Sequence, residues 1–232
     1  TAPSGLTSFM LCFAAFALLV AQADAERARV VGVPVSGRRR APEGLVGYCT
    51  HVLPIAAPAP AAGTVRAWLD GAREALVQAY EHQDLPFAEM RRGSAAQVEV
   101  TFNLDIGALS APGGARLATP GWRSRREPFP LRVNLTAIGE DLAIEAGHQS
   151  ACYGAEEVGR LLGRYRDLLQ RLCEAADDAP VAQIAPPAKA PAVPGLRDGA
   201  PIVAAVPAGP AEMNDIERCL AEAIGRALNL EA

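Results

Sequence analysis

Long basic runs are missing from this sequence, and their absence argues against a nucleic-acid-binding protein. The net charge is −4 at pH 7, lysine is rare, and arginine supplies most of the positive charge. The two basic clusters, at 38–40 and 123–126, are too short to change this conclusion. Half of the residues are apolar and 21% are charged, which is typical of a globular chain and not of a disordered one.

Cysteine is sparse and poorly arranged for cross-linking. The five cysteines are an odd number, and no two of them have the C-x-x-C spacing. This pattern disfavours both a disulfide framework and a zinc site. We therefore expect the protein to lie in a reducing cytoplasm. We expect its cysteines to be free thiols that bind no metal: Cys12, Cys49, Cys152, Cys173 and Cys219.

No apolar run is long enough to cross a membrane, which takes about 20 residues. The longest run, from Phe9 to Val20, is followed by A-x-A patterns and so resembles the core of a secretory signal peptide. No positive charge precedes it, which disfavours a cleaved leader. We expect instead a helix over 6–22 that is buried on several sides. The start at Thr1, not at Met, favours a fragment of a longer protein.

The order of apolar residues predicts strands. A β-rich run at 29–33 is expected to end at Pro34 and Gly37, and a second run at 48–53 is expected to end at Pro54. Apolar and polar residues alternate strictly at 97–104, as in a half-buried strand. The same alternation at 131–137 and 142–146, around a turn at 139–141, predicts a hairpin.

Three- and four-residue spacing predicts two further helices. One begins after Thr64, whose hydroxyl can accept from the first free amides, and ends near Asp84. The other, at 154–175, has the clearest apolar stripe and must pack on a sheet or another helix. After it, seven prolines and three charged residues at 185–211 indicate an extended linker. An amphipathic stretch follows at 212–228.

Several of these segments, in order, resemble one family. The motifs are VVGVPVSGR at 30–38, LVGYCTHVLP at 45–54, HQDLPF at 82–87 and QVEVTFNL at 97–104. The helix FAAFALL at 13–19 precedes them, and the paired strands at 130–145 and the helix and exit at 154–184 follow. Together, over about residues 8–185, they resemble the second, C-terminal lobe of a nonribosomal peptide synthetase condensation domain.

The resemblance implies an α/β (α+β) fold of the chloramphenicol-acetyltransferase type, in which each lobe is a mixed β-sheet flanked by helices. Two such lobes would enclose a tunnel in which carrier-bound acyl or peptidyl and aminoacyl thioesters form an amide. The family's catalytic motif, H-H-x-x-x-D-G, stands in the first lobe. It is absent here, where the three histidines His51, His82 and His148 are not adjacent. The resemblance therefore implies no catalytic residue in this chain and no activity for the chain alone.

The resemblance also implies domain bounds and partners. Residues 1–185 would form the lobe, 186–211 a Pro/Ala-rich linker, and 212–232 the first helix of a truncated carrier protein domain. The expected partners are the N-terminal lobe and the upstream and downstream carrier domains, with no nucleic acid and no membrane. No cofactor would bind directly, and the phosphopantetheine arms of the carriers would bring the substrates. An O-acyltransferase of the same superfamily, a non-catalytic carrier-docking lobe and a secreted protein remain alternatives.

The resemblance places ten residues at the tunnel or the lobe junction: Gly32, Pro34, Gly37, Arg38, Gly47, His51, His82, Gln83, Asp84 and Asn103. Arg38 could pair with an acid of the other lobe, touch a phosphate, or lie on the surface. His51 stands where the family often has Asn, and either lines the tunnel or is structural. His82 at a helix end is predicted to be structural, because the helix dipole alone explains a histidine there. The shortened segment at 90–94 departs from the family's R-D-x-S-R-x-P-L.

Overall fold

The computed structural model describes residues 5–23, 30–38, 45–47, 49–57, 63–84, 98–106, 127–138 and 141–185. The elements in chain order are α1 (Ser8–Ala23), β1 (Val30–Val35), β2 (His51–Ala56), α2 (Val65–Glu81), β3 (Val100–Ile106), β4 (Leu131–Ile138), β5 (Asp141–His148), α4 (Ala155–Glu174) and α5 (Val181–Ile184). The predicted linker, the last amphipathic stretch, Cys219 and the shortened segment at 90–94 lie outside the described residues.

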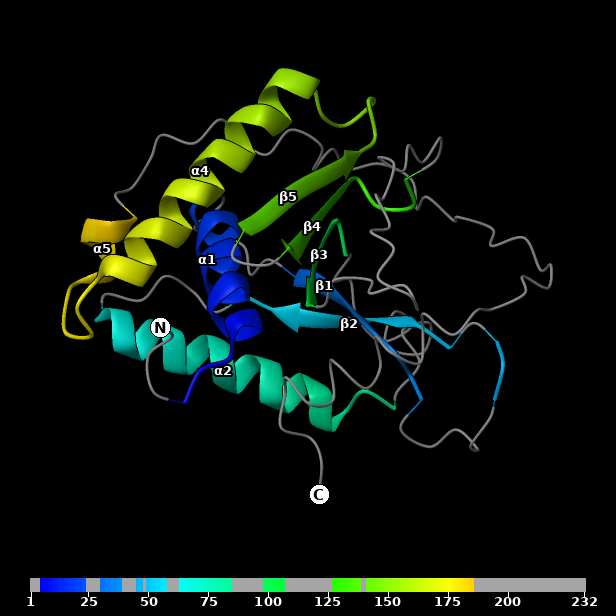
Figure 1. Cartoon of the computed structure of the whole chain (residues 1–232), viewed down its shortest axis with the longest axis horizontal. Coiled ribbons are helices and arrows are strands. Elements are labelled where there is room, and N and C mark those ends of the chain that lie inside the picture. The colour runs from blue at the N-terminus through cyan, green and yellow to red at the C-terminus, as the bar shows by residue number, and fades with distance from the viewer. Residues whose placement is uncertain are drawn as a thin grey trace.

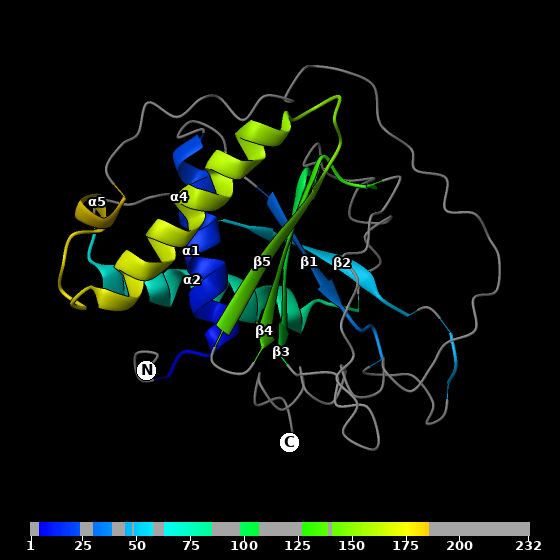
Figure 2. The ribbon, with the colours of Figure 1, turned by 45° about the horizontal axis from the view of Figure 1, so that its top comes forward.

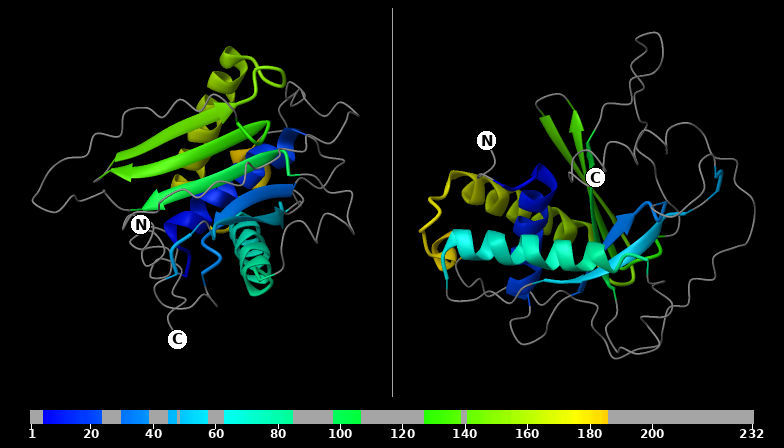
Figure 3. Two further views of the ribbon diagram at one scale, coloured as in Figure 1. Left: turned by 90° about the vertical axis from the view of Figure 1, so that its right-hand side faces the viewer. Right: turned by 90° about the horizontal axis from the view of Figure 1, so that it is seen from below.

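The strands form one mixed sheet with the order β2-β1-β3-β4-β5. The central strands β1, β3 and β4 are parallel, while β2 and β5 pair antiparallel with β1 and β4 at the two edges. The helices α1, α2 and α4 all lie on one face of this sheet (Figures 1 and 3). The expected fold class, a mixed sheet flanked by helices, is confirmed.

Helix α1 is the centre of the packing. It contacts α2, α4 and β3, and it lies between the sheet and α4 (Figure 2). Because nearly every side of this helix is apolar, no side of it can face water without a cost. Its buried residues are Phe9, Leu11, Cys12, Phe13, Ala14, Ala15, Phe16, Ala17, Leu18, Leu19, Val20 and Ala21. The predicted buried helix is therefore confirmed.

Aromatic rings join α1 to the sheet and to α4. Phe102 of β3 is fully buried, and its ring stacks on Phe16 with centroids 5.0 Å apart. Phe9, Phe13 and Tyr165 also contact the Phe102 ring, at centroid distances of 5.9, 6.1 and 6.2 Å. Aromatic pairs at these distances contribute about 0.5–1.5 kcal/mol beyond the burial of their area. This cluster fixes α1 against the middle of the sheet.

Two buried side chains reach α1 through hydrogen bonds. Trp68 Nε1 of α2 donates to the Ala14 carbonyl oxygen at 3.2 Å, and the Tyr165 hydroxyl of α4 donates to the Cys12 carbonyl oxygen at 3.1 Å. Burial raises the pKa of Tyr165 well above its ordinary value, so the hydroxyl stays protonated and remains a donor. These bonds satisfy polar atoms that burial would otherwise leave without a partner.

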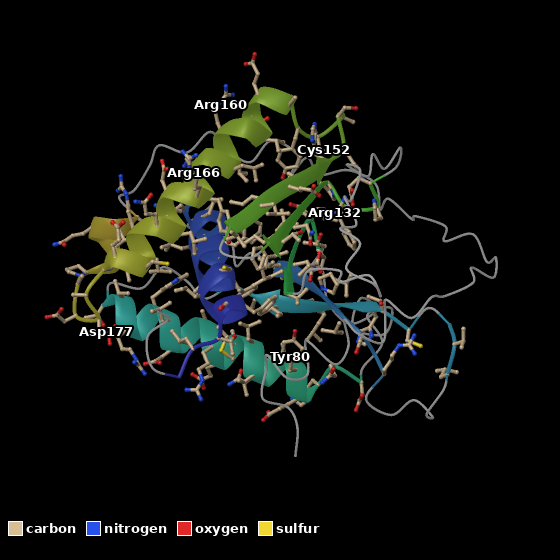
Figure 4. All side chains as sticks on the ribbon, in the orientation of Figure 1. Tyr80, Arg132, Cys152, Arg160, Arg166 and Asp177 are labelled. Carbon is tan, nitrogen blue, oxygen red and sulfur yellow. The ribbon has the colours of Figure 1, made fainter. Side chains whose placement is uncertain are left out.

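The N-terminus of α2 is closed by a cap and by the chain that follows α4. Thr64 Oγ1 accepts from the Ala67 amide at 3.3 Å, as the sequence predicts. The Val65 amide donates to the Ala179 carbonyl at 2.8 Å, and the Arg66 amide donates to the Asp177 carbonyl at 2.9 Å. Figure 4 shows Asp177 beside the start of α2, whereas Arg160 and Arg166 project from the outer side of α4.

The prediction that Pro34 and Pro54 end their strands is wrong. Pro34 lies inside β1 and pairs with Val52, and Pro54 lies inside β2 and pairs with Gly32. Proline lacks an amide hydrogen, so it is tolerated where no neighbouring strand needs that donor. Strand β2 is at the edge of the sheet, and the parallel pairing between β1 and β3 is confined to Val31 and Gly32. Both prolines therefore cost the sheet little.

Glycine at position 32 is required by packing, and this gives a first test. A Cβ at Gly32 would lie 2.6 Å from the Cγ1 atoms of Val52 and Val98 and 3.0 Å from Cγ2 of Thr101. Because valine side chains are stiff, we expect Gly32→Ala to lower the free energy of unfolding by about 1–3 kcal/mol. Gly159→Ala is the matched control, since nothing lies within 4 Å of its Cβ position in α4.

In urea denaturation, Gly159→Ala should raise the free energy of unfolding by about 0.5–1 kcal/mol, because alanine is the better helix former. Equal effects of the two substitutions would contradict the described packing of β1.

The buried thiol of Cys12 gives a second test. Burial raises its pKa to about 11, so at pH 8 only about 0.1% of it is the reactive thiolate. Cys173 is exposed, although partial burial also raises its pKa. We expect a thiol reagent at pH 8 to label Cys173 in the native protein and Cys12 only after unfolding, as followed by peptide mass spectrometry. Native labelling of Cys12 at the rate of Cys173 would show that α1 is not buried as described.

Candidate functional site

The ends of β1 and β2 form a tight corner that only glycine permits at position 37. Gly37 has a φ of 61°, in the left-handed region that side chains rarely adopt. A Cβ there would overlap the Cys49 carbonyl oxygen and lie 2.8 Å from His51 Nδ1. The segment after β1 therefore passes directly against the segment that begins β2.

Arg38, the next residue, stabilises this corner through hydrogen bonds from its side chain to two backbone carbonyls. Its Nη1 donates to the Leu45 carbonyl oxygen at 2.7 Å, and its Nη2 donates to the Gly47 carbonyl oxygen at 3.1 Å. The planar guanidinium can bind two carbonyls at once, which a lysine ammonium would do less well. Two exposed apolar side chains, Leu45 and Val46, lie on the loop that Arg38 fixes.

His51 connects the corner to the end of α2. Its Nε2 lies 2.7 Å from the backbone carbonyl oxygen of Gln83. Because a carbonyl oxygen can only accept, His51 Nε2 is the donor in this hydrogen bond and carries a hydrogen. Gln83 is buried, and its side-chain Nε2 donates to the Tyr80 carbonyl oxygen at 2.9 Å. Burial raises the pKa of Tyr80 to about 12, so its phenol is neutral beside this site.

His82 and Asp84 flank Gln83 but point outward. His82 ends α2, and its backbone amide, not its ring, donates to the Ala79 carbonyl oxygen. Both side chains are exposed. His82 lies at a helix end, as the sequence predicted, and neither residue joins the bonds between His51 and Gln83.

The remaining predicted residues, Gly32, Pro34 and Asn103, lie on the face of the sheet opposite the helices. Alternation decides this, since Val31, Val33 and Phe102 of the same strands are buried under the helices. No helix or strand among the described residues covers this open face (Figure 3). We call it the open face below.

Asn103 belongs to a cluster of four polar side chains on the open face. Its Nδ2 donates to Asp105 Oδ1 at 2.8 Å and to Asn134 Oδ1 at 2.8 Å. Asn134 Nδ2 donates to Asp105 Oδ2 at 2.9 Å and to Thr136 Oγ1 at 3.4 Å. The parallel register pairs Asn103 with Asn134 and Asp105 with Thr136, so the four residues occupy the corners of a rectangle on β3 and β4. We call them the β3–β4 polar cluster.

A second polar group lies near the start of β4. Arg132 Nε donates to Glu127 Oε2 at 3.1 Å, and the carboxylate of Glu127 is only 6% exposed. The pair passes over Gly147 of β5, where a Cβ would overlap Glu127 Oε2. Figure 4 shows Arg132 on the strand side of the molecule, away from the helices.

Neither a group of metal ligands nor a membrane-spanning helix is found among the described residues. No group of three or more His, Cys, Asp and Glu side chains within the described ranges could hold a metal ion. In the same ranges, none of the helices combines the length and the hydropathy that a membrane span needs. The four described cysteines are unpaired.

Residues 1–187 match the protein family described as "Condensation domain". The chain belongs to this family. Tyrocidine synthase 3 of Brevibacillus parabrevis is 26% identical over 182 residues, which are 74% of this chain and 3% of that protein. Bacitracin synthase 1 of Bacillus licheniformis is 26% identical over 188 residues, which are 76% of this chain and 4% of that protein.

A solved structure, the condensation domain from the Monacolin K polyketide synthase MokA, has the same fold. Its TM-score is 0.62 at 16% identity, over 75% of this chain and 43% of that one. The chain thus spans less than half the length of each of these proteins.

In this condensation-domain chain, reasoning from the sequence missed five site residues. Asp105, Asn134 and Thr136 complete the polar cluster around Asn103, and Glu127, whose carboxylate is buried, forms an ion pair with Arg132. The alternation at 131–137 already puts Asn134 on the polar side of its strand. What it cannot give is the register, which decides that Asn134 and not a neighbour stands beside Asn103.

The bond between His51 and Gln83 gives a third test. His51→Ala should lower the free energy of unfolding by about 1–2 kcal/mol, because it leaves the Gln83 carbonyl without its donor. His82→Ala is the control one residue before Gln83, and it should change stability by less than about 0.5 kcal/mol because its ring is exposed. Denaturant midpoints of both variants measure this, and a smaller effect for His51 than for His82 would refute the connection.

Proposed function

We propose that this chain is the C-terminal lobe of a nonribosomal peptide synthetase condensation domain and supports amide formation between carrier-bound thioesters. Residues 1–185 would form the lobe, 186–211 a linker, and 212–232 the first helix of a carrier protein domain. In the reaction, the amine of an aminoacyl thioester attacks the carbonyl of an acyl or peptidyl thioester. The C–N bond forms, the C–S bond breaks, and the proton lost from the amine nitrogen ends on the sulfur, so that the donor carrier's arm leaves as a thiol.

One observation carries this proposal. Described residues of three segments that resemble the family's motifs, at 30–38, 45–54 and 82–87, meet at one corner, where His51 and Gln83 lie 32 residues apart in the sequence. Arg38 binds the carbonyls of Leu45 and Gly47, Gly37 packs on Cys49, and His51 binds Gln83. A shared fold alone needs a sheet and helices but does not need these particular residues to meet. Their contacts give the motif resemblance a physical basis.

The open face supports the assignment to one lobe of two. The helices bury only one side of the sheet, and the other side carries half-buried polar side chains such as Asn103 and Asn134. A sheet usually needs both faces covered when its central strands are parallel. We infer that the N-terminal lobe faces this side across the tunnel. It would supply the H-H-x-x-x-D-G motif that this sequence lacks.

The proposal also assigns roles to the carriers. Their phosphopantetheine arms would enter the tunnel from opposite sides and bring both thioesters to the histidines of the N-terminal lobe. This chain would then act by forming one wall of the tunnel and by holding the corner at Gly37, Arg38 and His51. Of its two motif histidines, His51 would hold the corner through its bond to the Gln83 carbonyl, His82 would end α2, and neither would move a proton.

The experiment supplies the N-terminal lobe in trans. The chain is mixed with two carrier domains loaded with an acyl and an aminoacyl group, with and without the polypeptide encoded directly upstream of it. We expect the amide product only in the mixture that contains both halves, because the catalytic histidines come from the other lobe. Mass spectrometry of the carrier-bound products measures the rate.

Each outcome of this mixture separates the alternatives. An amide made by this chain alone would contradict the proposal. An ester made from an alcohol acceptor, without an amide, would favour an O-acyltransferase of the same superfamily. Carrier binding without any product from both halves would favour a docking lobe without catalysis.

A further inference from the structure

The hydrogen bonds of the β3–β4 polar cluster fix which way its two amides face. Carboxylate oxygens accept hydrogen bonds, so the groups beside the two oxygens of Asp105 are the NH₂ ends of Asn103 and Asn134. The second hydrogen of Asn103 is then given to Asn134 Oδ1, and that of Asn134 is given to Thr136 Oγ1. Neither amide can flip without placing its oxygen against the carboxylate.

This arrangement leaves one amide oxygen without any described hydrogen bond and one hydroxyl hydrogen without a described acceptor. Asn103 Oδ1 accepts no hydrogen bond from any described residue, and Thr136 Oγ1 has accepted one but still has its own hydrogen to donate. One is a pure acceptor and the other a donor. Their residues occupy diagonal corners of the rectangle, and diagonal residues in neighbouring strands are about 7–8 Å apart.

A secondary amide matches this pair. Its N–H and C=O point in opposite directions, and with a hydrogen bond of about 2.8–2.9 Å at each end it spans a similar distance. The N–H would donate to Asn103 Oδ1 and the C=O would accept from Thr136. Nearby on the same face, the hydroxyl of Thr101 is buried and has no hydrogen-bond partner among the described residues, so this face needs polar partners from elsewhere.

We propose that Asp105 is a positioning residue that orients Asn103 and Asn134, so that the open face binds a secondary amide of the thioester-bearing arm or its peptide. This inference rests on the proposed function, because that function supplies amide-containing thioesters to this face. Asp105 itself does not touch the ligand. It acts by excluding the flipped amides, which would present NH₂ groups to the N–H of the ligand.

The test is a titration of the full chain with pantetheine, which has two secondary amides, followed by NMR of the side-chain amides and the Thr136 methyl group. We expect saturable shifts at Asn103 and Thr136. An analogue methylated at both amide nitrogens should bind about tenfold more weakly, since it cannot donate to Asn103 Oδ1. No saturable shift at these residues would overturn the proposal.

Three variants separate positioning from simple structural support. Asp105→Asn should alter the NH₂ signals of both asparagines and weaken pantetheine binding about tenfold. Thr136→Val should weaken binding while the NH₂ groups of Asn103 and Asn134 stay bonded to Asp105. Glu145→Gln is the matched control, because Glu145 of β5 is exposed and stands opposite Asn134 in the register of β4 and β5, but is outside the cluster. It should leave both signals and binding unchanged.

Equal binding by the Asp105→Asn and Glu145→Gln variants would overturn the role of Asp105. If Asp105→Asn does not fold, Thr136→Val decides by itself, and unchanged pantetheine binding in that variant would overturn the proposed contact. The titration needs neither a partner lobe nor turnover. Its failure therefore leaves amide synthesis by the two halves as a separate question, and failure of that synthesis leaves the titration interpretable.

Discussion

Helix α1 has no polar face, so protein must surround it, and the sheet, α2 and α4 together supply that surrounding. This requirement explains why three helices gather on one face of the sheet. It also explains why two of the polar side chains at the α1 surface, Trp68 and Tyr165, donate their hydrogen bonds to α1 carbonyls. Because α1, α2 and α4 all pack on this face, none of them covers the open face of the sheet.

The open face carries the β3–β4 polar cluster and most of the close backbone contacts described above. Its strands carry glycine or proline where neighbours come close, as at Gly32 and Pro34, and hydrogen-bonded polar groups elsewhere. The corner at Gly37 and Arg38 follows β1, and the β3–β4 polar cluster lies toward the ends of β3 and β4. Because β1, β3 and β4 are parallel, these features share the carboxyl end of the sheet. Ligands of open α/β sheets commonly bind at that end.

The sequence predicted the helices and the hairpin well because their periodicity is strong. The apolar residues of α2 and the cap at Thr64 were correctly predicted, and so were the paired strands now called β4 and β5. Strand ends were predicted less well, because Pro34 and Pro54 look like breakers until the edge position of β2 is known. The corner could be anticipated only by resemblance to a family, whereas its contacts between Arg38, Gly47 and His51 depend on the folded loop.

The register was the main element that local sequence could not provide. A shift of one residue between β3 and β4 would separate Asn103 from Asn134 and move Asp105 away from both. The ion pair of Glu127 and Arg132 was hidden for a similar reason, since only the folded sheet shows that Gly147 of β5 lies against the Glu127 carboxylate. Long-range pairing, and not local preference, decides both features.

If this chain is one wall of a two-lobed amide-forming enzyme, the other wall must be encoded beside it. The most direct measurement is therefore the coding sequence immediately upstream of Thr1. We expect a continuous reading frame that encodes a first lobe with the H-H-x-x-x-D-G motif about one lobe's length away. A frame that is interrupted, or that continues without this motif, would contradict the two-lobed enzyme.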